Sequence, residues 1–210
     1  MTHARTAAIG LGLVSAFLAA CGSASRGTPV LDPVAQARAD SARLPYTSGD
    51  IRFVTGMIHH HGQAITMSKL APANGASQDV QTLAARIINA QTDEIALMQQ
   101  WLRDRRQPVP EPSPTGMRMV MGGVEHDMLM PGMLTDAQMK ELDAANGAAF
   151  DRRFLELMIY HHRGAVTMVK ELLDSPGAAL DETIFKLAAD MNTDQSTEIV
   201  RMQQMLLVRD

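Results

Sequence analysis

The chain has 210 residues and a formal net charge of −4, and 46% of its residues are hydrophobic although only 4% are aromatic. This length, with 20% charged residues, favours one packed domain over a disordered or multidomain protein. The mildly acidic charge excludes the basic footprint of a nucleic-acid-binding protein. A single cysteine excludes an internal disulfide and a thiolate zinc cluster, whereas sixteen methionines are far more than usual.

The first twenty residues have the pattern of an export signal. Arg5 precedes an uncharged run, residues 7–20, which is too short to span a membrane and has the length of a secretory apolar region. Its end, Leu18-Ala19-Ala20-Cys21, resembles the lipobox of bacterial lipoproteins, which implies cleavage before Cys21 and a lipid on its sulfur. A plain signal peptide with an incidental cysteine is the alternative.

Residues 21–48 are rich in Gly, Ser, Ala and Pro without a sustained apolar period, which predicts a flexible tether. We therefore expect an exported domain anchored to the cell envelope through lipidated Cys21. Which membrane leaflet holds it stays open: the outer face of the cytoplasmic membrane, or the outer membrane.

The remaining chain, 49–210, repeats itself. Residues 50–67 and 151–168 share ten identities in eighteen positions, and residues 83–102 and 187–206 share ten in twenty. The two offsets, 101 and 104, differ by three residues, so each element is kept and the loop between them changes length. Repeat one spans 49–105, a crossover spans 106–134, and repeat two spans 135–208.

Apolar residues recur every three or four positions in both windows, which predicts helices. We expect long helices near 49–70, 79–105, 148–174 and 180–208, and a short one at 135–146 that begins with a capping box of Thr135 and Gln138. No alternating segment indicates a strand. Because one amphipathic hairpin cannot bury its apolar face alone, two copies predict an all-α, four-helix bundle with approximate twofold symmetry.

The inward stripe of each repeat carries two adjacent histidines, His60-His61 and His161-His162. Burying an unpaired imidazole nitrogen costs about 1 to 3 kcal/mol, so four buried rings favour a functional use. A purely structural alternative is that one histidine of each pair binds Glu94 or Glu198 and fixes the helix register.

Methionines accompany these histidines and could converge on them within each repeat. Thioether and imidazole together form a soft to borderline ligand set that suits Cu(I), tolerates Cu(II) and suits Mg, Ca or Mn poorly. Gln91 and Gln195 lie one helical turn before the glutamates and could support the ligands. The predicted metal ligands beside the histidines are Met57, Met67, Met98, Met158, Met168 and Met202.

The crossover is also rich in methionine. A solvated loop has no core to fill, so these residues favour a mobile acceptor for soft cations. A loop packed by its own methionines is the alternative. The candidate ligands here are Met121, His126, Met128, Met130 and Met133, accompanied by Met117 and Met119.

Two further residues interrupt the repeat. His59 corresponds to Tyr160, so the repeat does not require a histidine there, and we expect it to face solvent or a helix neighbour. Trp101 corresponds to Met205 and is expected in the core.

Three segments resemble the bacterial domain-of-unknown-function 305 family, which includes CopM-like copper-binding proteins. They are residues 57–67 (MIHHHGQAITM), 130–133 (MPGM) and 158–168 (MIYHHRGAVTM). The resemblance covers about residues 45–208. It implies a ferritin-like bundle in the envelope, and for some members copper binding and tolerance through Met and His.

The favoured function is therefore a non-catalytic, envelope-anchored protein that sequesters or transfers copper, or silver. A ferritin-like dinuclear oxidase or peroxidase is the enzymatic alternative, but its Glu-x-x-His pattern occurs nowhere in the sequence. A bundle that binds no metal and serves a structural or partner-binding role is the third hypothesis. No nucleic-acid partner is expected, and a protein partner for metal transfer is unknown.

Overall fold

A computed structural model describes residues 32, 34, 38 and 45–208. Within the described residues, five helices and one hairpin follow in chain order: α2 (Ser48–Ala73), α3 (Gln78–Asp104), β1 (Met117–Met121), β2 (Val124–Met128), α4 (Asp136–Ala144), α5 (Ala148–Asp174) and α6 (Glu182–Leu207). Of the predicted all-α fold, the helical character is confirmed, and the helix bounds lie within a few residues of those expected. The predicted signal peptide, Cys21 and most of the predicted tether lie outside the described residues.

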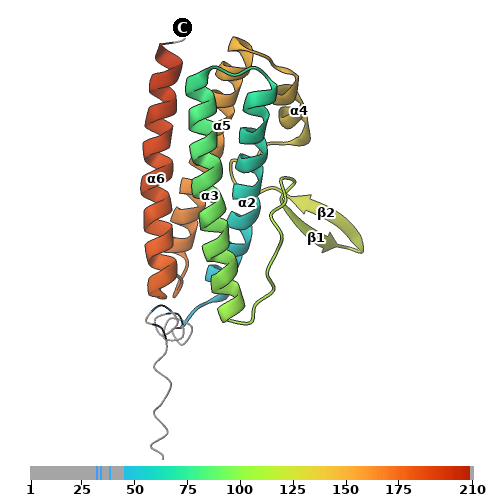
Figure 1. The fold of residues 1–210 in the computed structure, drawn as a ribbon. Helices are drawn as coiled ribbons and strands as arrows, with labels where there is room; N and C mark the ends of the chain where they lie inside the picture. The colour runs from blue at the N-terminus through green and yellow to red at the C-terminus, as the bar shows by residue number, and fades with distance from the viewer. Residues whose placement is uncertain (1–31, 33, 35–37, 39–44, 209–210) are drawn as a thin grey trace, which may run out of the picture. The chain divides into compact units, whose positions relative to one another are not determined.

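The four long helices lie side by side (Figure 1), with α2 packed on α3, α5 on α6, and α2 on α5. The short helix α4 contacts α5 and α2. The two repeats thus form two helical hairpins whose first helices, α2 and α5, meet in the middle. Among the described residues, no helix is both long and apolar enough to cross a membrane.

The two repeats hold each other through one aspartate each. Asp50 closes a capping box with Thr47 at the start of α2, and its other carboxylate oxygen accepts the Ala179 N–H at 2.7 Å, in the α5–α6 loop. Its repeat counterpart Asp151 accepts the Ser77 N–H at 3.0 Å, in the α2–α3 turn. Both carboxylates are buried, and each accepts a hydrogen bond from a backbone N–H in a loop of the opposite repeat.

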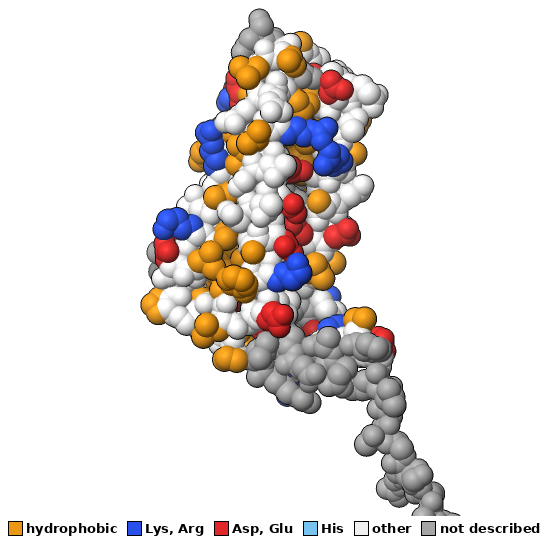
Figure 2. Space-filling model, turned by 90° about the vertical axis from the view of Figure 1, so that its left-hand side faces the viewer, with side chains coloured by type: hydrophobic (Ala, Val, Ile, Leu, Met, Phe, Trp, Pro, Cys, Tyr) orange, Lys and Arg blue, Asp and Glu red, His pale blue; other side chains and the backbone are white. Residues whose placement is uncertain are grey.

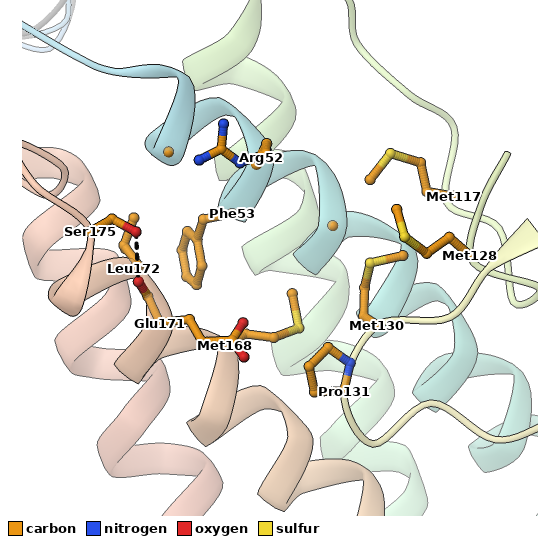
Figure 3. A pocket seen from close by; sticks show the side chains of 12 residues that line it. Arg52, Phe53, Met117, Met128, Met130, Pro131, Met168, Glu171, Leu172 and Ser175 are labelled. Carbon is orange, nitrogen blue, oxygen red and sulfur yellow. Dashed lines mark hydrogen bonds between the residues drawn. The ribbon is translucent and has the colours of Figure 1, made fainter. Parts of the chain in front are cut away.

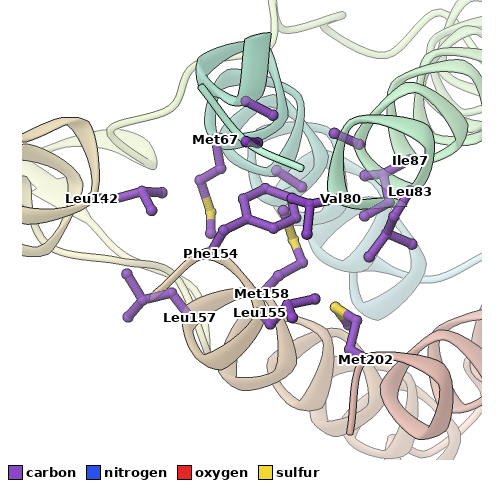
Figure 4. Packing of buried hydrophobic residues seen from close by; sticks show 14 of the residues in the cluster. Met67, Val80, Leu83, Ile87, Leu142, Phe154, Leu155, Leu157, Met158 and Met202 are labelled. Carbon is purple, nitrogen blue, oxygen red and sulfur yellow. The ribbon is translucent and has the colours of Figure 1, made fainter. Parts of the chain in front are cut away.

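The apolar core forms two clusters, one toward each end of the bundle. The first joins Met67 on α2 to Phe154 and Met158 on α5 (Figure 4). The second joins Phe53 and Met57 on α2 to partners that include Trp101, whose expected core position is confirmed. His60-His61 and His161-His162 lie between the residues of these clusters along α2 and α5. Water is therefore kept from the histidines at both ends.

Acidic, basic and apolar side chains are interspersed on the face over α6 (Figure 2). On this helix Lys186 donates to Asp190 at 2.7 Å, one turn along, and both side chains are exposed. Such an exposed pair contributes little, because water and salt screen the two charges. The surface of α6 therefore adds little to the stability that the buried clusters supply.

The crossover contains a β-hairpin that the sequence analysis missed. β1 and β2 pair antiparallel, with Met117 opposite Met128 and Met121 opposite Val124. Gly122 and Gly123 form the turn with φ of +61° and +82°, as the tight turns that suit a twisted hairpin require. The fold is therefore mostly helical with a small two-stranded sheet, instead of all-α.

The crossover folds back onto the bundle, which contradicts the expected solvated loop. Met133 is buried, and Met130 packs partly buried against the second apolar cluster. The turn at Pro131 and Gly132 reaches α5 at Gly164, where a Cβ would stand 2.0 Å from the Pro131 carbonyl oxygen. Only glycine at position 164 allows this approach.

We expect Gly164→Ala to lower the free energy of unfolding by about 1–3 kcal/mol, because the added methyl displaces the turn at Pro131. Alanine is the better helix former by about 1 kcal/mol, so a stabilised variant in urea unfolding would contradict the close approach. Arg163→Ala, at the exposed neighbouring position, is the control and should change stability little.

Candidate metal centre

Four histidines form a fully buried layer where α2 packs on α5. The ring centroids of His60 and His161 lie 3.8 Å apart, at an interplanar angle of 38°. His61 and His162 flank them, with centroids 6.2 Å and 6.4 Å from the ring of their chain neighbour. All four side chains have no exposed surface. The repeated doublets thus meet at the centre of the bundle.

Each outer histidine binds a glutamate on the neighbouring helix. His61 Nε2 lies 2.7 Å from Glu94 Oε2 on α3, and His162 Nε2 lies 2.7 Å from Glu198 Oε2 on α6. These are the contacts that the register alternative predicts. They are also the contacts by which carboxylates orient metal-binding histidines, so they are compatible with both interpretations.

The remaining ring nitrogens distinguish this layer from an ordinary polar core. His60 Nδ1, His61 Nδ1, His162 Nδ1 and both nitrogens of His161 make no hydrogen bond of normal geometry, although the backbone of each central histidine lies near the ring of the other. Because Nε2 of His60, His61 and His162 faces an oxygen acceptor, it carries the proton in the neutral ring, and Nδ1 then holds a free lone pair. The two central rings therefore present buried lone pairs for which the described residues offer no donor in normal hydrogen-bond geometry.

Burial also keeps the two central rings uncharged. Loss of hydration lowers the pKa of His60 and of His161 well below the ordinary value, and the neighbouring histidines lower both pKa values further. A neutral imidazole is the form that binds a metal ion, because protonation would occupy the lone pair. The central pair is therefore ready to bind metal at neutral pH without losing a proton first.

The predicted methionine ligands are all buried, but those of one repeat divide between the two apolar clusters. Met57, Met98 and Met168 belong to the second cluster, whereas Met67, Met158 and Met202 belong to the first. Gln91 and Gln195 are buried one turn from the glutamates, and both have unpaired amide atoms. In the described part of the chain, no three His, Cys, Asp or Glu side chains converge on one point.

The family described as "Domain of unknown function (DUF305)" matches residues 50–206, most of the chain. The chain belongs to the DUF305 family. The resemblance that the histidine and methionine motifs indicated is thus confirmed.

Solved structures from the DUF305 family match this fold. A DUF305 protein from Streptomyces coelicolor, described as secreted, is 33% identical, with a TM-score of 0.63 over 77% of this chain and 94% of its own. A DUF305 fragment from Deinococcus radiodurans is 27% identical, with a TM-score of 0.63 over 78% and 98%. CopM in its Cu(I)-bound form is 29% identical, with a TM-score of 0.56 over 77% and 96%. CopM structures with Cu(II) and with Ag also match. No curated protein matches the chain.

In this DUF305 chain the crossover covers the histidine layer. The Pro131 carbonyl accepts a hydrogen bond from His60 Nε2 at 3.1 Å. His59, which we expected at the surface or beside a helix neighbour, is buried and accepts the Ser113 N–H through Nδ1 at 3.2 Å. His59 is buried because the crossover folds back over the position where we expected solvent.

Gln63 is the residue that sequence reasoning missed. Its amide nitrogen donates to the carbonyls of Pro114 and Leu134 at 2.7 Å and 2.9 Å, and its amide oxygen accepts the Leu134 N–H at 2.6 Å. A usable signal was present, because Gln63 is a polar residue on the buried stripe and its repeat counterpart is Gly164. The first repeat thus binds the crossover through Gln63, and the second repeat leaves space for it at Gly164.

Three other crossover candidates lie on the β1–β2 hairpin. His126 and Met128 are exposed on β2, and Met121 lies at the end of β1. Cys21 lies outside the described residues. The structure thus places the four histidines and two glutamates in one layer, whereas Met130 and Met133 pack against the bundle and Met128 is exposed on the hairpin.

Proposed function

We propose that this DUF305 protein binds Cu(I), or Ag(I) in its place, in the layer of four buried histidines. The observation that carries the proposal is the set of unpartnered nitrogens on fully buried rings. Each unsatisfied buried group costs about 1 to 3 kcal/mol, and a soft cation would offset that cost by accepting the lone pairs. The Cu(I), Cu(II) and Ag forms of CopM, which shares this fold, support the choice of metal.

The role that fits this arrangement is sequestration or transfer in metal tolerance, with the copper as cargo. Enclosure between two apolar clusters would shield a bound cuprous ion from water, which favours holding the ion over turnover of a second substrate. We infer a binding protein and not an enzyme. Oxidase turnover by the copper-loaded protein would contradict this inference. We also propose that the helices be classed as a ferritin-like four-helix bundle.

Replacing both central rings, in the double variant His60→Leu/His161→Leu, should abolish tight Cu(I) binding while the apo protein stays folded. It removes three unsatisfied nitrogens, and it loses only one hydrogen bond, to Pro131, worth about 1 kcal/mol. The free energy of unfolding should therefore hold or rise. Competition with a chromogenic Cu(I) chelator and urea unfolding provide the two measurements.

The control for this double variant is His126→Leu, at an exposed position on β2, which should leave both quantities unchanged. Unaltered Cu(I) affinity in His60→Leu/His161→Leu would refute the proposed site. Loss of stability without loss of affinity would favour a structural role for the rings.

Removing the charge of both glutamates, in Glu94→Gln/Glu198→Gln, should weaken Cu(I) binding by about 10–100-fold, because the carboxylates orient the outer rings. Glutamine keeps a similar shape and can still accept the Nε2–H. Asp93→Asn, at the exposed neighbouring position, is the control. If these contacts fix only the helix register, thermal stability will fall and Cu(I) affinity will stay the same.

We propose that the protein is exported and held at the envelope by a lipid on Cys21. The secreted description of the Streptomyces relative supports export, and the lipobox pattern supports the anchor. Cys21→Ala should move the protein from the membrane fraction to the soluble exported fraction. An unchanged distribution after cell fractionation would remove the anchor from the proposal.

A further inference from the structure

A second group of sulfur atoms surrounds a pocket beside the bundle. The pocket, about 360 Å³ in volume, lies between the β1–β2 hairpin and helices α2 and α5. Met168 extends from α5 toward Met130, while Met117, Met128 and Met130 stand together on the opposite side (Figure 3). Met117 and Met128 are paired in the hairpin register, which places them on the same face.

Gly56 on α2 creates the room for this group. A Cβ at Gly56 would lie 3.3 Å from Met168 Cε and 3.4 Å from Met130 Sδ. The two side chains thus meet over the bare backbone of α2, although they come from elements far apart in the chain. The corresponding residue of the second repeat is Leu157, which is buried, so only the first repeat provides this space.

Core filling accounts for Met168, which is buried in the second apolar cluster, but not for Met117, Met128 and Met130. Met57, Met67 and Met98 fill the core with no exposed surface, whereas Met128 is 44% exposed and Met117 and Met130 are only partly buried. A methionine that only filled a gap would close it, because its side chain adapts to irregular space. Here the four side chains leave an open volume between them. Thioethers that line an accessible space are available to a ligand.

We infer that this pocket, lined by Met117, Met128, Met130 and Met168, is a second soft-cation site that takes Cu(I) or Ag(I) from solvent. The inference rests on the proposed function for the identity of the metal. Thioether sulfur is a soft ligand that selects Cu(I) over hard cations, and it does not titrate. The site thus differs from the histidine layer in ligand type, accessibility and response to pH.

The pocket also adjoins the histidine layer through the backbone. Met130 precedes Pro131, whose carbonyl accepts the hydrogen bond of His60 Nε2. Met168 follows His161 by seven residues, which is about two helical turns along α5. An ion held by Met130 and Met168 therefore lies next to the elements that carry the central rings, so the pocket can serve as the outer of two binding positions.

The test compares two variants of the purified chain during titration with Ag(I), which avoids copper redox chemistry. The triple variant Met117→Leu/Met128→Leu/Met130→Leu removes the sulfurs and nearly conserves volume. His60→Leu/His161→Leu removes the central imidazoles. Bound Ag(I) is counted by metal analysis after desalting, and methionine methyl signals are followed by NMR with ¹³C-labelled methionine.

We expect the triple variant to bind about one Ag(I) fewer per chain than the wild type. In His60→Leu/His161→Leu the methyl signals of Met117, Met128 and Met130 should still shift with Ag(I). Met139→Leu/Met205→Leu, with the thioethers changed elsewhere in the fold, is the control and should lose no Ag(I). Gly56→Leu, which copies the second repeat, should fill the pocket and lose the same ion with every sulfur retained.

Three results would overturn the inference: the triple variant binds as much Ag(I) as the wild type, Gly56→Leu does so, or the pocket signals stop responding once the imidazoles are removed. The proposed function fails separately, if His60→Leu/His161→Leu loses no Ag(I). Pocket signals that respond in that case would leave the outer site standing alone.

Discussion

The burial of four imidazole rings between α2 and α5 is the constraint on which the rest of this structure depends. Taking polar rings out of water is unfavourable unless each nitrogen finds a partner. Glu94 and Glu198 partner one nitrogen of each outer ring, and Pro131 partners one of His60. The remaining ring nitrogens are enclosed by apolar clusters on both sides. The packing of these clusters thus holds the rings in place, although it offers their nitrogens no hydrogen-bond partner.

The duplication explains the symmetry of the bundle, and the differences between the copies explain its chemistry. Asp50 and Asp151 make equivalent contacts to loops of the opposite repeat. The two histidine–glutamate pairs make equivalent contacts between the helices of their own repeat. Where the copies differ, the crossover packs: Gln63 binds its backbone, and the counterpart Gly164 gives it room. His59 lies beneath the crossover, whereas Tyr160 at the same repeat position is 50% exposed.

The helices could be predicted from sequence because their signals are local. Apolar period, the capping box of Thr135 and Gln138, and the repeat itself all indicate the same elements, and the capping box is present as expected. The hairpin could also have been predicted, since Gly122-Gly123 separates two short runs that contain valine. It was missed because methionine-rich runs lack the β-branched character usually taken to mark a strand.

The site was harder to predict because a shared helix stripe does not bring residues together. Met57 and Met67 lie on one stripe, yet ten residues advance a helix by about 15 Å, so the two sulfurs enter different clusters. Pairing of His60 with His161 depends on the axial register of α2 against α5. That register is fixed by the reciprocal aspartates and the loops, which no periodicity reveals.

The two candidate sites make opposite use of the same ligand chemistry. A metal ion must compete with protons for the imidazole lone pair. Burial reduces that competition here, because it keeps the central rings neutral. Thioether sulfur has no such competition and can remain exposed to an acidic or variable exterior without losing its lone pairs. An exported protein that meets soft cations at its surface and encloses them in its core would need both properties. The crossover supplies the exposed sulfurs and, through Pro131, one of the contacts that orients the buried rings.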